Sequence, residues 1–222
     1  MADYNSGPVI LTGMVLSSSP VSDYDRRIVI LTKERGKITA FAKGARRQGS
    51  RLLACTDQFC FGNFKMFEGR TAYNLVEASI TNYFEDLRQD FDSACLGMYF
   101  LEFADYYTRE NNDEMKMLKL LYQSMRALCK SSLDNRLVRV IYEMKAMVVN
   151  GEFPGIPAQS SLSDAARYTI GFIVDTPVEK LFTFAVSDSV LTELAGLSKE
   201  YIDKFIDRKF KSLEIFDSMG VV

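Results

Sequence analysis

A basic segment that follows a strand-like alternation is the part of this sequence with the clearest chemistry. Residues 37–51 read KITAFAKGARRQGSR, in which the alternation runs to Phe41 and then gives way to basic residues. Residues 26–51 hold nine Lys/Arg against one acid, Glu34, in a chain whose net charge is −2. The nine are Arg26, Arg27, Lys33, Arg35, Lys37, Lys43, Arg46, Arg47 and Arg51. Such a patch attracts a polyanion, and nucleic acid fits best, although an ordinary solvated basic face has the same composition.

Catalytic motifs are missing. The chain has no histidine, which removes the commonest general base and metal ligand and excludes a Ser-His-Asp or Cys-His mechanism within it. It has no GxxxxGKS/T phosphate-binding loop and no GxGxxG, HExxH or GxSxG. The densest acidic cluster is Glu85, Asp86, Asp90 and Asp92, at the start of a predicted helix. We expect it to cap that helix; a carboxylate-only metal site of a nuclease is the alternative.

Composition is that of a globular protein. The chain has 222 residues, of which 47% are hydrophobic and 25% charged. No apolar run approaches the roughly 20 residues that span a bilayer, and the N-terminus lacks a secretory pattern, so we expect a cytoplasmic protein without a membrane partner. The four cysteines, Cys55, Cys60, Cys95 and Cys129, form no CxxC pair. We expect buried free thiols, no metal and no cofactor.

The chain divides into two halves that differ in periodicity and charge. Residues 1–80 carry a net charge of +4 and residues 81–222 a net charge of −6. The first half reads as five short strands separated by turn signals: Val9–Leu16, Arg27–Leu31, Lys37–Ala42, Cys60–Phe67 and Tyr73–Ile80. This pattern predicts a small closed or partly open barrel. Most of its aromatic residues should fill the barrel, leaving one or two able to stack on bases.

The second half has helical periodicity. Apolar residues recur at three- and four-residue spacings in Leu87–Thr108, Asp113–Cys129 and Leu133–Val149, which predicts packed amphipathic helices. The segment Gly151–Ser163 then breaks the pattern with two glycines and two prolines. The methionines of these helices suit core filling, or an adaptable peptide-binding groove. The predicted fold class is α+β, with a barrel domain over residues 1–80 and a helical domain over residues 81–222.

The order of these motifs resembles the RecO family of bacterial recombination mediators. That family has a G-x-V-L motif, a D-R-I-V-x-x-L-T segment and a G-K-I/L-x-A-x-A-K-G-A-R-R segment followed by S-R-L. The corresponding stretches here are Gly13–Leu16, Asp25–Thr32, Gly36–Arg47 and Ser50–Leu52. An F-x-x-G-x-F-x-x-x-x-G-R stretch matches Phe59–Arg70, and the tail KFKSLEIF over residues 209–216 is similar to the family's closing K-S-L segment.

The resemblance implies an OB-fold barrel joined to an α-helical domain. It implies binding of single- and double-stranded DNA, strand annealing, and loading of recombinase onto DNA coated by single-stranded DNA-binding protein. The implied partners are RecR and the acidic C-terminal tail of that coating protein, and the site of action would be the nucleoid. Many members carry a four-cysteine zinc module after the third long helix, where residues 151–163 of this chain hold no cysteine.

We therefore expect a non-catalytic DNA-binding mediator. Phe41 is the aromatic candidate for stacking, with barrel core as the alternative, and Gly44 would let the backbone turn and approach the strand. The residues expected to hold phosphates are Arg35, Lys37, Lys43, Arg46, Arg47 and Arg51. The residues expected to bind the tail peptide are Lys116, Lys119, Arg126, Arg136 and Arg139, on two successive helices; a solvated helix face is the alternative.

Two other functions fit the same residues. An RNA-binding translation or ribosome-associated factor could use the same barrel, and contacts to the 2′-hydroxyl would distinguish it. A metal-dependent nuclease would use Glu85, Asp86 and Asp90, and would reveal itself by magnesium-dependent cleavage of DNA.

Overall fold

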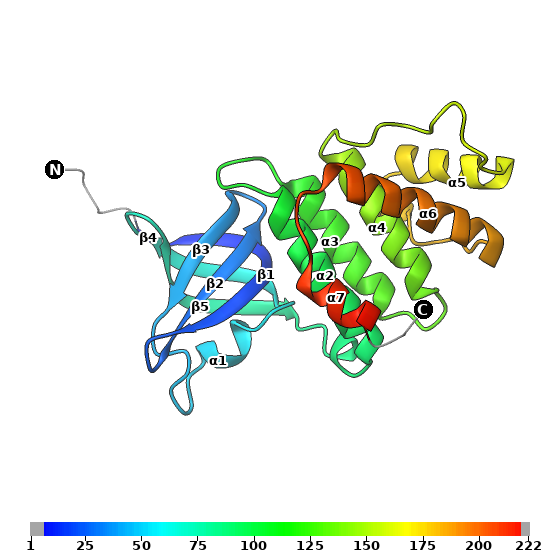
Figure 1. Ribbon diagram of the computed structural model, residues 1–222. Helices are drawn as coiled ribbons and strands as arrows, with labels where there is room; N and C mark the ends of the chain where they lie inside the picture. Colours follow the sequence, from blue (N-terminus) through cyan, green and yellow to red (C-terminus); the bar gives the residue numbers. More distant parts are fainter. Residues whose placement is uncertain (1–6, 219–222) are drawn as a thin grey trace. The chain divides into compact units, whose positions relative to one another are not determined.

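The computed structural model describes residues 7–218 and confirms the α+β class, with a five-stranded barrel followed by helices (Figure 1). The strands are β1 (Val9–Val21), β2 (Asp25–Thr32), β3 (Gly36–Ala42), β4 (Phe61–Glu68) and β5 (Tyr73–Asn82). They close in the order β1-β2-β3-β5-β4. Neighbouring strands are antiparallel except β3 and β5, which run parallel. A short helix, α1 (Leu52–Cys55), lies between β3 and β4.

Alternation along the strands builds the barrel core. In β3, Ile38, Ala40 and Ala42 are buried, while the residues between them are only half-buried. The other strands supply the larger side chains of the same cluster, which include Val15, Ile28, Ile30, Phe64, Met66 and Tyr73. Residues of one face alternate with residues of the other, as the period of a strand requires.

Strand β1 is longer than the sequence predicts. We expected it to close on Ser17–Pro20, but it continues to Val21 and pairs with β2 through Val21 and Asp25. A register shift between Val15 and Ser17 bends the strand there. Pro20 is tolerated because it lies near the end of the pairing, at the barrel surface.

Two glycines occupy positions where a neighbouring barrel strand leaves no room for a side chain. Gly13 of β1 and Gly62 of β4 are register partners. A Cβ at Gly13 would clash with the carbonyl of Leu31, and one at Gly62 with the carbonyl of Ser79. Larger residues at either position would therefore force the strands apart.

The helices follow the barrel in the chain. They are α2 (Phe91–Tyr107), α3 (Met115–Leu128), α4 (Asn135–Val149), α5 (Asp164–Asp175), α6 (Asp188–Phe205) and α7 (Lys211–Ser218), with 3-10 turns at Asp86–Arg88 and Val178–Lys180. Helices α4, α5 and α6 pack against one another (Figure 1). Met117, Met125, Met144 and Met147 are fully buried, so these methionines fill the core. None of the helices described over residues 7–218 is long and apolar enough to cross a membrane.

The structure divides into two compact units. Over the described residues, one comprises residues 7–85 and Leu101–Leu118, and the other Asp86–Phe100 and residues 119–218. In the first unit, residues after α2 join the barrel: the N–H of Lys37 donates to the carbonyl of Arg109 over 3.0 Å, and that of Asn111 to the carbonyl of Arg35 over 2.9 Å. The domain boundary at residue 80 stays a prediction.

Cysteine burial follows the expectation at three positions. Cys55, Cys60 and Cys95 are buried free thiols, whereas Cys129 is exposed. Cys129 comes directly after Leu128, the last residue of α3, where the chain turns toward solvent. The expectation of four buried thiols was therefore wrong for Cys129.

Candidate nucleic-acid interface

Two loops at one end of the barrel are joined by hydrogen bonds. The first is the turn between β1 and β2, and the second is the loop that leaves β3 at Lys43. The N–H of Gly44 donates to Asp25 Oδ1 over 2.7 Å. The N–H of Arg46 donates to the carbonyl of Tyr24 over 2.8 Å. Gly44 has φ of +67°, a left-handed conformation that favours glycine, so the backbone turns here as the sequence predicts.

Five of the six predicted phosphate-binding residues have exposed side chains: Arg35, Lys43, Arg46, Arg47 and Arg51. Arg46 also donates from Nη1 to the carbonyls of Ser22, over 3.4 Å, and Asp23, over 3.3 Å. The guanidinium carbon of Arg47 lies 5.3 Å from the centre of the Tyr24 ring. Lys43, Arg46 and Arg47 thus share one loop, and their charge faces solvent.

Lys37 differs from the other five. Its ammonium donates to the Asp105 carboxylate over 3.1 Å and to the Asp105 carbonyl over 2.6 Å. Only 23% of the Lys37 side chain is exposed. Its charge is therefore largely compensated inside the protein, and we expect it to contribute less to phosphate binding.

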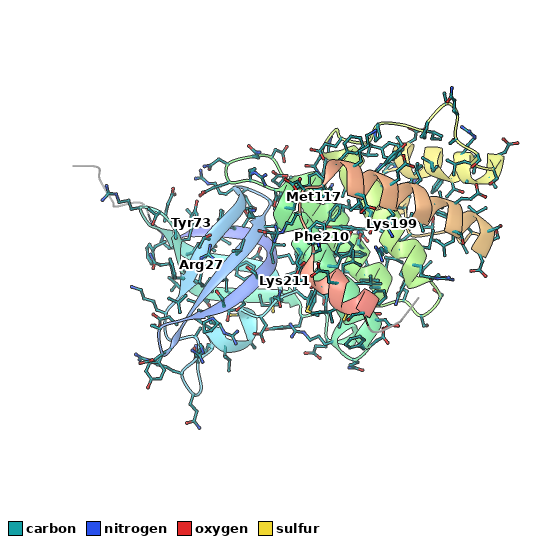
Figure 2. All side chains as sticks on the ribbon, in the orientation of Figure 1. Arg27, Tyr73, Met117, Lys199, Phe210 and Lys211 are labelled. Atoms are coloured by element: carbon teal, nitrogen blue, oxygen red, sulfur yellow. The ribbon has the colours of Figure 1, made fainter. Side chains whose placement is uncertain are left out.

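Arg26 and Arg27 have opposite environments although they are adjacent. Arg26 Nη1 donates to Asp57 Oδ1 over 2.6 Å and to the Leu53 carbonyl over 3.1 Å, which ties β2 to the α1 region. Arg27 is exposed on β2 (Figure 2). Sequence reasoning included both in one basic window. The signal that separates them is the strand period, because consecutive residues of a strand point to opposite faces.

Phe41 lies on the outer face of the barrel rather than in its core. Its register partner on β2 is Arg27, and its partner on β5 is Asn74. Asn74 is in turn the partner of Phe67 on β4, whose side chain is 45% exposed. These four residues form a row across four strands, with about 4.8 Å between neighbours. Phe64 and Tyr73 belong to the buried barrel cluster and Phe59 is buried as well, whereas Phe61 is half-buried. Three of these six barrel aromatics are therefore buried, fewer than the majority that the sequence predicts.

Comparison with known proteins shows which protein family the chain resembles. The family model for the N-terminal part of recombination protein O matches residues 8–84, and the model for its C-terminal part matches residues 88–156. The DNA repair protein RecO of Alkaliphilus metalliredigens is 32% identical over 186 residues, which cover 81% of this chain and 76% of that protein. The chain belongs to the RecO family.

Further relatives match over nearly their whole length. The DNA repair protein RecO of Acetivibrio thermocellus is 24% identical over 240 residues, covering 94% of this chain and 96% of that protein. That of Clostridium novyi is 23% identical over 234 residues, covering 92% of this chain and 91% of that protein. The family assignment therefore extends beyond the basic barrel into the helices.

One member of the acidic cluster, Asp90, caps a helix. Asp90 Oδ2 accepts from the N–H of Ser93 over 2.9 Å, at the start of α2. Hydrogen bonds from the Ser93 hydroxyl and N–H lower the pKa of the Asp90 carboxyl. Within residues 7–218, no group of three or more Cys, Asp or Glu side chains is arranged to hold a metal ion. The capping role expected of this cluster is confirmed for Asp90.

The residues expected to bind the tail peptide have unequal surroundings. Lys116, Lys119 and Arg126 are exposed on α3, where their spacing places them on one side of the helix. Lys119 lies 3.4 Å from Glu179. On α4, Arg136 pairs with Asp134 at 2.7 Å and with Asp188 at 3.0 Å, and these carboxylates raise its pKa.

Arg139 belongs to a buried polar network. Its Nε donates to Glu143 Oε1 over 2.8 Å, and only 2% of the Glu143 side chain is exposed. Glu143 also accepts from the Tyr99 hydroxyl over 2.8 Å and from the Ser198 hydroxyl over 2.6 Å. A buried carboxylate needs a compensating cation, so Arg139 has a structural role whether or not it binds a peptide.

Proposed function

We propose that this RecO-family chain is a non-catalytic mediator that binds single- and double-stranded DNA and anneals complementary strands. With RecR as its partner, it would help to load recombinase onto DNA coated by single-stranded DNA-binding protein. It would do so at the nucleoid in the cytoplasm. The observation that carries the proposal is the group of exposed cations on one loop, Lys43, Arg46 and Arg47, followed along the chain by exposed Arg51. Arg35 is exposed too, but it lies in the β2–β3 turn, at the opposite end of β3 from this loop. The names of the relatives, DNA repair protein RecO, support it.

Phosphate binding explains this arrangement better than stability does. The stability of a protein gains little from exposed cations that lack a carboxylate partner, because water solvates such charges equally well in the unfolded chain. The same cations strengthen the binding of a polyanion such as DNA, because each phosphate that they neutralise releases a condensed counterion. The outward row of Arg27, Phe41, Asn74 and Phe67 adds aromatic and polar groups that reach bases rather than phosphates.

Salt dependence tests the proposal. Four to six phosphate contacts predict a slope of about −3 to −4 in log affinity against log salt for single strands. Replacing Arg46 and Arg47 together by Ala should weaken binding equally for unrelated sequences and make the slope shallower by about 1 to 1.5. Fluorescence anisotropy of labelled oligonucleotides at several salt concentrations measures both quantities. An affinity that does not depend on salt would contradict the proposal.

A matched control distinguishes the effect of the loop cations from the effect of removing positive charge anywhere on the protein. The pair Lys180→Ala and Lys199→Ala removes the same charge from exposed positions of the helical unit and should leave the slope unchanged. An annealing assay, with and without single-stranded DNA-binding protein, then tests mediation. Competition with RNA of the same sequence tests the alternative of an RNA-binding factor.

A further inference from the structure

Tyr24 is an exposed aromatic residue that sequence reasoning did not single out. It lies in the turn between β1 and β2, and 52% of it is exposed. The buried barrel cluster does not include it. An aromatic side chain at a turn with this exposure contributes little to the core, and its ring is accessible to a ligand.

The turn that carries Tyr24 is held from both sides. The Tyr24 carbonyl accepts from the N–H of Arg46, and the carboxylate of the next residue, Asp25, accepts from the N–H of Gly44. The Arg46 guanidinium donates to the carbonyls of Ser22 and Asp23. These bonds constrain the backbone before any ligand arrives. A side chain on a constrained turn loses less freedom on binding than one on a free loop.

The surroundings of Tyr24 are cationic. The guanidinium of Arg47 lies 5.3 Å from its ring centre, an arrangement that steadies the ring through a cation–π interaction. Arg46 and Lys43 are exposed on the same loop as Arg47. A DNA strand whose phosphates contact these side chains would therefore bring its bases close to the exposed part of the Tyr24 ring.

Stacking distinguishes unpaired from paired DNA. An unpaired base offers a free π-face to an aromatic side chain, and this contact is tolerant of sequence. In a duplex each base stacks between its neighbours, so the ring finds a free face only at an end or a disrupted pair. Contacts to phosphates alone do not distinguish single-stranded from duplex DNA, because both forms carry phosphates.

We propose that Tyr24 stacks on an unpaired base and so strengthens the binding of single strands relative to duplex DNA. The proposal rests on the DNA binding proposed above and names the residue that selects the form of DNA. Arg47 positions the ring and also contributes its charge. Arg46 holds the turn.

Substitution of Tyr24 tests the proposal. In Tyr24→Ala, affinity for an oligo-dT strand should fall about tenfold, affinity for a blunt duplex of equal length should change less than twofold, and the salt slope should stay the same. Tyr24→Phe keeps the ring and should bind like the parent protein. Equal losses for both forms of DNA, or an unchanged affinity for the single strand, would overturn the proposal. So would the same selective loss in Tyr24→Phe.

A tryptophan at this position gives a direct readout. The chain contains no Trp, so Tyr24→Trp creates a single indole emitter. Oligo-dT should quench its fluorescence at saturation, while the duplex should not. The control is Tyr168→Trp on α5, at a position that is 76% exposed, and oligo-dT should leave its emission unchanged. Absence of quenching in Tyr24→Trp while anisotropy shows binding would overturn the stacking role and leave the DNA-binding function standing. If the parent protein binds neither form of DNA, both proposals fail.

Discussion

The environment of each basic side chain in this protein decides which property it affects. Arg26, Lys37 and Arg139 have carboxylate partners within the chain, at 2.6, 3.1 and 2.8 Å. Replacing them removes this cation from Asp57, Asp105 or Glu143, so stability suffers first, most at the buried Glu143. Lys43 and Arg51 are exposed, and substitutions there should affect ligand binding with little effect on stability.

Asp90 gives a prediction at the level of a single residue. Asp90→Ala should lower the free energy of unfolding by about 1 kcal/mol at neutral pH, since the N–H of Ser93 loses its acceptor. Because folding lowers the pKa of Asp90, its contribution exists above the ordinary value of 3.8 and disappears as the pH falls through the folded value. Urea unfolding at several pH values measures this. Asp90→Ser, which restores a cap, should recover most of the loss, and DNA binding should be unchanged in both variants.

The regular elements were largely predictable from their periodicity. Five strands were expected and five are found over residues 7–218, because alternating residues such as Ile38, Ala40 and Ala42 must share one face. Less predictable were the features that depend on pairing between distant segments. The extension of β1 depends on a bulge, and the joining of the β1–β2 turn to the Gly44–Arg47 loop depends on tertiary hydrogen bonds. Tyr24 was missed for the latter reason, since its position beside Arg47 follows from the fold.

Helix α5 provides the prediction at the level of elements. The buried ammonium of Lys145 on α4 donates to the carbonyls of Ile173, Val174 and Thr176, over 3.0, 2.7 and 2.9 Å, and so caps the C-terminus of α5. Lys145→Met should lower the free energy of unfolding by about 2–3 kcal/mol, because these carbonyls lose a charged donor. Urea unfolding measures the effect. Lys199→Met, at an exposed position of α6, should change stability by less than about 0.5 kcal/mol.

The pH dependence of the stability difference between the parent protein and Lys145→Met tests whether the Lys145 ammonium is desolvated. Burial lowers the pKa of Lys145 below its ordinary value of 10.5, although the charge of Asp175 opposes the shift. The native state therefore binds this proton less tightly than the unfolded chain does. As the pH rises from the lowered value toward 10.5, the stability of the parent protein should increase relative to Lys145→Met. A constant difference across this range would mean that the ammonium is not desolvated.

At the scale of the whole molecule, family membership says more about function than amino-acid composition does. Charge and periodicity indicate a basic barrel and an acidic helical region, with net charges of +4 over residues 1–80 and −6 over residues 81–222. They do not indicate recombination, RecR or a peptide partner. The family models extend the assignment across both parts of the chain. Residue types alone are a poor guide to the expected peptide site, because Arg136 and Arg139 look like free cations in the sequence but have carboxylate partners in the fold.

If the two halves bind different ligands, their functions should separate by mutation. Arg126 is the best probe of the proposed peptide site, because it is exposed on α3, whereas reversal of Arg139 would place a second carboxylate beside buried Glu143. Arg126→Glu should weaken binding of an acidic peptide with an apolar C-terminal residue at least tenfold, since the peptide carboxylate needs a cation. Its affinity for DNA should stay within twofold of the parent value. The Arg46→Ala and Arg47→Ala pair should show the reverse.

Calorimetry with the peptide and anisotropy with DNA measure the two affinities on the same preparations. Lys180→Glu makes the same change from cation to anion at an exposed position outside α3 and should leave both affinities unchanged. If Arg126→Glu and Lys180→Glu weaken peptide binding equally, the attraction is a general effect of charge and no local site exists. If Arg126→Glu weakens DNA binding as strongly as peptide binding, one surface binds both ligands. The assignment of DNA to the barrel and of the peptide to the helices is then wrong.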